Sequence, residues 1–150
     1  AYYGAALLAT GDQSGALGAF ERALKDDPNN FDANLRMGML LRQDEKFDQA
    51  MPYLHHALEI RPGDPGVRYQ IASIDLARGN LAEAQAGLDA LVKEAPEFIE
   101  AHVSLATVYY RLKRKADGDR ERQIVDRLNA RKQNTDVLPV KSQEPPRQEN

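Results

Sequence analysis

A helix ending recurs three times in this chain, at an unvarying interval of 34 residues. The three stretches are ALKDDPNN at 23–30, ALEIRPGD at 57–64 and LVKEAPEF at 91–98. Each contains a proline, which prevents the preceding helix from continuing, at Pro28, Pro62 and Pro96. A fixed period of roughly 20–50 residues is typical of repeat architectures, in which each unit stacks on a copy of itself. The period therefore predicts a stack of similar helical units.

Four columns of similar residues keep the same spacing. Two columns hold small residues, namely Gly4, Gly38, Ala72 and Ala106, and then Ala16, Ala50, Ala84 and Gly118. Two more are apolar and lie three positions apart, namely Phe20, Leu54 and Leu88, and then Ala23, Ala57, Leu91 and Val125. Small residues let two antiparallel helices approach closely, and the apolar pair forms one helical face toward the next unit. The columns predict helix pairs, and the supply of Ala with no Trp suits close helix packing better than a sheet.

Turn residues mark where the helices begin and end. Gly11 and Gly79 stand where the first helix of a pair should stop, and glycine tolerates the left-handed cap conformation. Asn30 and Asp64 precede the helices that follow the prolines and are suitable N-caps.

The pattern resembles the tetratricopeptide repeat (TPR) family over residues 1–132. The second repeat meets the family pattern in full, through Gly38, Ala50, Leu54, Ala57 and Pro62. The resemblance implies an all-α fold, a right-handed α-α superhelix of about four helix-turn-helix repeats. The expected repeats are 1–30 (lacking its first four residues), 31–64, 65–98 and 99–132. Residues 133–150, polar and with three prolines, are expected to form a disordered tail.

Several positions depart from the family pattern. The fourth position, often Trp in the family, holds Asn34, Arg68 and His102. The eleventh, usually Tyr or Leu, holds Asp75 in the third repeat. In the fourth repeat Arg122 replaces the large apolar residue, and only a narrow stripe remains, Ile124, Val125 and Leu128. We expect this repeat to be a water-facing cap, and the chain to be the C-terminal part of a longer array.

The resemblance also implies a binding surface. In the family, the first helix of every pair lines a concave groove that binds an extended peptide or a partner helix. Carried over, the groove positions predict contacts from Tyr2, Leu35, Arg36, Met39, Arg42, Tyr69, Gln70, Ser73, Val103, Thr107, Tyr110 and Arg111; the same positions also include Leu8 and Gln43. Tyr and Arg are enriched among binding hot spots. The alternative is that neighbouring repeats bury several of these side chains.

Charge is distributed unevenly, which suggests a second interpretation. Residues 1–110 hold 9 Lys and Arg against 16 Asp and Glu, whereas residues 111–132 hold 9 against 4. The acidic body of one chain could meet the basic end of another, as in a homo-oligomerising or assembly module of a bacterial secretion or envelope complex. The segment TDVLPVK at 135–141 is a local candidate for self-docking. The basic run RLKRK at 111–115 is more typical of a solvated cap than of a nucleic-acid patch.

Catalysis, metal binding and nucleic-acid binding are not predicted. No catalytic triad, phosphate loop or zinc pattern occurs, so we expect a non-enzymatic protein without cofactors. His55 and His56 are adjacent and point about 100° apart on a helix, and His102 is expected to pack between helices. Only Arg36 resembles a member of the basic clamp by which some TPR proteins bind chaperone tails. The acidic body opposes RNA binding of the pentatricopeptide kind, and no run approaches the roughly 18 apolar residues of a membrane span.

Overall fold

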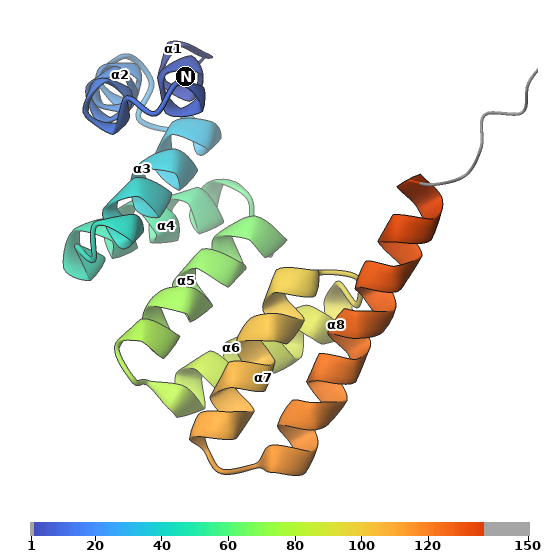
Figure 1. Cartoon of the computed structure of the whole chain (residues 1–150). Helices are drawn as coiled ribbons and strands as arrows, with labels where there is room; N and C mark the ends of the chain where they lie inside the picture. Colours follow the sequence, from blue (N-terminus) through green and yellow to red (C-terminus); the bar gives the residue numbers. More distant parts are fainter. Residues whose placement is uncertain (1, 137–150) are drawn as a thin grey trace, which may run out of the picture.

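The computed structural model describes residues 2–136, which form eight helices and no strand. Residues 1 and 137–150 lie outside this description. The helices are α1 (Tyr2–Ala9), α2 (Gln13–Asp26), α3 (Phe31–Gln43), α4 (Phe47–Ile60), α5 (Pro65–Ala77), α6 (Leu81–Glu94), α7 (Ile99–Arg111) and α8 (Lys115–Asp136). They stack as successive pairs (Figure 1), and the predicted all-α helical-repeat solenoid is confirmed.

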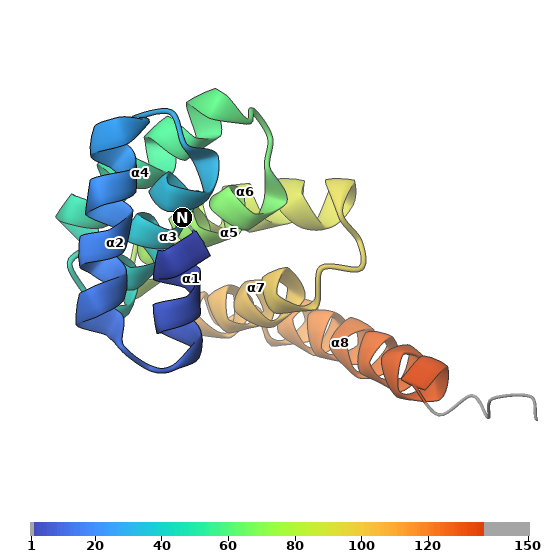
Figure 2. The same cartoon turned by 90° about the horizontal axis from the view of Figure 1, so that it is seen from above.

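The last helix differs from its counterparts in length. α8 has 22 residues, whereas α2, α4 and α6 have 14 each. Figure 2 shows its C-terminal end running outward beyond the other helices. The polar composition of residues 133–136 predicts a disordered tail, but these residues form the last turn of α8. No proline precedes Pro139 in this stretch, so the helix is free to continue past residue 132. The remainder of that tail, and most of the segment 135–141, lies outside the described residues.

The predicted caps begin the helices. The side chain of Asn30 accepts a hydrogen bond from the Ala33 N–H at 2.9 Å, and Asp64 accepts from the Val67 N–H at 3.0 Å. Each cap satisfies a backbone donor that has no partner within its helix. Asp12, not singled out from the sequence, does the same for Gly15 at 2.8 Å.

The turn inside each pair uses one left-handed residue. Gly11 and Gly79 have φ values of 82° and 79°, as predicted for C-caps. The residues 34 positions away from them, Glu45 and Lys113, have φ values of 57° and 60°. All four turns thus adopt the same backbone conformation, although only two of them have glycine.

Within each pair, a small residue faces a large one. A Cβ atom built on Gly4 would lie 2.8 Å from Cε1 of Phe20, and one on Gly38 would overlap the Leu54 side chain. Ala72 and Ala106 continue this column and are buried. The large residues of the facing column, Phe20, Leu54 and Leu88, are fully buried. The columns therefore do what the spacing predicted, except at Arg122, which is exposed on α8 as expected of a cap.

In the second and fourth repeats, the residue at the fourth position fastens the chain to the turn before it. The Nδ2 group of Asn34 donates to the carbonyl oxygen of Pro28 at 3.0 Å, and Nε2 of His102 lies 2.7 Å from that of Pro96. In the third repeat, Arg68 bonds instead to the carboxylate of Glu94. Asn34 and His102 are both buried, so His102 packs between helices as predicted.

Candidate partner-binding surface

The first helices of the pairs form one surface of the molecule, which we call the first-helix face. α3 packs beside α5 and α5 beside α7, and in Figure 1 these three helices lie in front of α4 and α6. Every groove residue predicted from the sequence lies on α1, α3, α5 or α7. The side chain of Tyr2, the first residue of α1, lies outside the described residues.

At the N-terminal end of this face there is a hollow of 290 Å³ between α1 and α3. It is lined by Leu8, Gly11, Gln13, Arg36, Met39, Leu40 and Gln43. Arg36 and Met39 were predicted together, and the structure brings them to the same hollow. Arg36 pairs with Asp32 on its own helix at 3.4 Å, but both side chains are substantially exposed, so the pair is weak. The guanidinium therefore has N–H groups to offer a ligand, beside the adaptable side chain of Met39.

The middle of the face is held by contacts within the protein. Nε of Arg42 donates to Oε1 of Gln70 at 2.6 Å, which ties α3 to α5, and Gln70 is only 6% exposed. The Tyr69 ring packs edge-on against Phe98 with centroids 5.3 Å apart. Ser73 donates to the carbonyl oxygen of Tyr69 at 2.7 Å. Gln70 therefore has little surface for a ligand, and the terminal nitrogens of Arg42 are the polar groups with capacity left.

Leu35 is half-buried and packs against the N-terminal core cluster. Its contribution to the first-helix face is therefore partial. This agrees with the alternative interpretation, in which neighbouring repeats bury some of the predicted groove residues.

The C-terminal end of the face has exposed side chains on α7. Val103 is 41% exposed and Tyr110 is 40% exposed, one turn on either side of the exposed Thr107. Nη1 of Arg111 donates to the carbonyl oxygen of Leu76 at 3.0 Å, which links α7 to α5. Val103, Thr107 and Tyr110 thus present an apolar strip with an arginine at its end.

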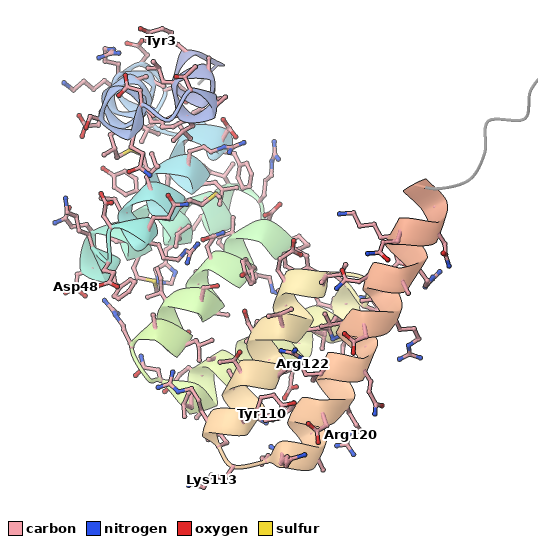
Figure 3. The ribbon with its side chains drawn as sticks, viewed as in Figure 1. Tyr3, Asp48, Tyr110, Lys113, Arg120 and Arg122 are labelled. Atoms are coloured by element: carbon pink, nitrogen blue, oxygen red, sulfur yellow. The ribbon has the colours of Figure 1, made fainter. Side chains whose placement is uncertain are left out.

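Tyr110 is held in place by a charged group on α8 (Figure 3). Its hydroxyl donates to Oδ1 of Asp119 at 2.7 Å, and this bond is the main reason that the pKa of Tyr110 lies above its ordinary value. Lys115 donates to the other oxygen of Asp119 at 2.7 Å. Lys115 and then Tyr110 lower the pKa of Asp119, because both hydrogen bonds favour the carboxylate.

The sequence did not indicate every residue of the hollow at α1. Gln13 begins α2 and Leu40 lies in the core of α3, so neither belongs to the groove positions of a first helix. The 34-residue period does not identify these two residues, because their place in the hollow depends on the distance between α1 and α3.

Among residues 2–136, no group of three His, Asp or Glu side chains is placed to hold a metal ion. His56 bonds to Asn29 at 2.9 Å and to Glu59 at 3.3 Å. None of the helices in the same range combines the length and apolar character that a membrane crossing requires.

A solenoid of helix pairs that presents the first helices on one face defines a helical-repeat scaffold, a class of protein that acts by binding other proteins. Residues 4–65 and residues 41–106 each match a model of the tetratricopeptide repeat. The chain belongs to the tetratricopeptide repeat family, whose members bind protein partners and generally serve as non-enzymatic scaffolds.

Solved structures show the same fold. MamA from Desulfovibrio magneticus RS-1 is 25% identical with a TM-score of 0.76, and the match covers 85% of this chain and 72% of that one. A tetratricopeptide repeat protein from Parabacteroides merdae is 19% identical with a TM-score of 0.71, covering 85% of this chain and 51% of that one.

One curated relative is a larger protein. DnaJ homolog subfamily C member 3 of Rattus norvegicus is 31% identical over 93 residues, which are 62% of this chain. The match spans only 18% of that relative's length.

Proposed function

We propose that this chain is a non-enzymatic interaction module that holds an extended peptide or a partner helix on its first-helix face. The observation that carries the proposal is the hollow between α1 and α3, where Leu8 and Met39 lie beside Arg36. The exposed Val103 and Tyr110 supply further apolar contacts along the same face. Apolar anchors next to arginine are the usual composition of a binding hot spot.

A peptide selection tests the proposal. Peptides that bind the wild-type chain would be selected from a random display library, and their affinities measured by fluorescence anisotropy. We expect Met39→Glu to weaken the selected peptides at least tenfold, because it removes an apolar anchor and places a carboxylate beside Arg36. Arg36→Ala should weaken them by roughly three- to tenfold.

The control variant is Gln49→Glu, an exposed position on α4, outside the first-helix face. It introduces the same charge and should leave the affinities unchanged. Equal weakening by Met39→Glu and Gln49→Glu, in variants with wild-type thermal unfolding, would place the binding site elsewhere.

Exposed apolar side chains and the charge distribution at the C-terminal end of the stack favour a second function, self-association. Among the described residues, three of the four exposed large apolar side chains are Val103, Tyr110 and Leu112, on α7 and just after it. The adjoining residues 111–132 are basic, and the rest of the body is acidic. These features suit self-association, in which the end of one chain meets the body of another.

Light scattering at low and high salt distinguishes the two functions. Self-association through opposite charges predicts a dimer or larger species that dissociates as salt rises, since screening weakens exposed pairs. A monomer at both salt concentrations contradicts self-association and leaves the first-helix face to a foreign partner.

A further inference from the structure

Two departures from the repeat pattern meet in the third helix pair. Asp75 occupies the column of Leu41 and Tyr109, both of which are buried. Gly87 occupies the column that holds Tyr53 and Glu121 in the neighbouring repeats. The two departures lie on different helices, α5 and α6, yet both line one hollow of 150 Å³. Leu58 of α4 and Arg68, Ile71 and Ala72 of α5 form the rest of its wall.

The glycine is not needed for the fold. Gly87 lies inside α6, where glycine weakens a helix. A Cβ atom at this position would lie 3.8 Å from the Cβ of Ala72, an ordinary contact, and no other side chain comes as close. Alanine would therefore fit. What glycine does at this position is leave the hollow open.

The hollow has one carboxylate in its wall, that of Asp75. Burial is the main cause that raises the pKa of Asp75, and the charge of Glu83 adds to it, while Asn80, Arg78 and His55 act in the opposite direction. Both nearby arginines already have carboxylate partners.

Arg68 bonds to Glu94, and Arg78 bonds to Asp48. Within residues 2–136, neither Asp75 nor Glu83 belongs to an ion pair.

We propose that this hollow is a binding site for an arginine side chain of a protein partner. The guanidinium would pair with the Asp75 carboxylate, and the aliphatic stem would rest against Leu58, Ile71 and Ala72. Arginine suits the site better than lysine, because a guanidinium is less strongly hydrated and meets a carboxylate with two parallel hydrogen bonds. Asp75 points about 120° away from Tyr69 around α5, so the site lies off the first-helix face and is independent of the function proposed above.

The site should lower the stability of the fold. An acidic group in an apolar column and a glycine within a helix both weaken the folded state, and such residues are typical of binding sites. Asp75→Leu and Gly87→Ala should each raise the thermal unfolding midpoint by roughly 2–4 °C. A lower midpoint for Asp75→Leu would show that the fold itself needs the carboxylate and would overturn the proposal.

Binding is tested with a matched pair of probes. N-acetylarginine amide and its neutral isostere, N-acetylcitrulline amide, are titrated to about 50 mM, a concentration at which binding with a millimolar Kd is detectable. Backbone amide resonances are followed by NMR. We expect the arginine probe to shift the resonances of Asp75, Gly87 and Ile71. The citrulline probe should shift them at least tenfold less.

Three variants complete the experiment. Asp75→Asn should abolish the shifts by removing the charge, and Gly87→Leu by filling the hollow. Asp44→Asn, which removes a carboxylate from an exposed turn, should leave them unchanged. No shift in the wild-type chain, equal shifts with both probes, or shifts that survive in Asp75→Asn would each overturn the proposal.

Discussion

Nδ1 of His102 lies 2.6 Å from Oε2 of Glu121, and the two side chains are only 5% and 14% exposed. The other ring nitrogen, Nε2, lies 2.7 Å from the carbonyl oxygen of Pro96. A carbonyl only accepts hydrogen bonds, so Nε2 must carry a hydrogen. Nδ1 is then the nitrogen that faces Glu121, and the two ring nitrogens connect α8 to the turn at Pro96. This buried hydrogen-bonded pair fastens α8 to α7.

We expect His102→Ala to lower the free energy of unfolding by about 2–4 kcal/mol, because it leaves a buried carboxylate and a carbonyl without partners. Urea denaturation measures the change. The control is His55→Ala, which removes an exposed histidine and should cost less than about 0.5 kcal/mol. Equal losses in the two variants would mean that the pair does not hold α8.

Glycine in place of the non-glycine residues at the left-handed turn positions should stabilise the fold. Glu45 and Lys113 adopt positive φ values that glycine adopts freely. Glu45→Gly and Lys113→Gly should each raise the free energy of unfolding by about 1 kcal/mol, and Gly79→Ala should lower it by a similar amount. Chemical denaturation of the three variants checks the signs. Destabilisation by both glycine substitutions would show that side-chain contacts outweigh the backbone strain.

The close approach at Gly38 predicts overpacking. An added Cβ atom would overlap the side chain of Leu54, which is fully buried and cannot move freely. Gly38→Ala should therefore cost about 1–3 kcal/mol in urea denaturation.

Gly18→Ala is the matched control for Gly38→Ala, because the nearest atom to its Cβ is Nη1 of Arg22 at 3.4 Å. It should gain up to about 1 kcal/mol from better helix propensity. Loss of stability in Gly18→Ala comparable to that in Gly38→Ala would contradict the role of the Leu54 contact.

Alkaline pH should weaken the fold through Tyr109. Burial, then the hydrogen bond and charge of Asp89, raise the pKa of Tyr109 to about 12. The hydroxyl donates to Asp89 at 2.9 Å. The unfolded chain releases this proton near pH 10, so the stabilisation is complete below about pH 10 and is lost as the pH rises toward 12.

The shift corresponds to roughly 2–3 kcal/mol. Urea denaturation at several alkaline pH values should therefore show a steeper decline for the wild-type chain than for Tyr109→Phe. Parallel declines would exclude Tyr109 as the cause.

The 34-residue period predicted the helix boundaries that recur along the chain. Pro28, Pro62 and Pro96 located the ends of three helices, and Asn30 and Asp64 the starts of two others. These signals act within a few residues of the chain, so they can be read without a structure. The left-handed conformations of Glu45 and Lys113 had no such signal, since neither residue favours positive φ.

Contacts between repeats could not be predicted in the same way. The hydrogen bond from Arg42 to Gln70 joins residues 28 positions apart, and it depends on the rotamers of two long side chains. The hollow at Asp75 likewise depends on three helices meeting. Asp75 is visible in the sequence as a departure from the family pattern, but nothing in the sequence indicates that Gly87 lines the same hollow.

The stacking order of the helices has a mechanical consequence. Within residues 2–136, each helix contacts only helices one or two places away along the chain. The buried side chains form two clusters, and α5 belongs to both, with Val67 and Ile74 in one and Ala72 in the other. A pull on the two ends of the chain would be transmitted from one helix pair to the next. Because α5 belongs to both clusters, the force would pass between the two clusters through this helix.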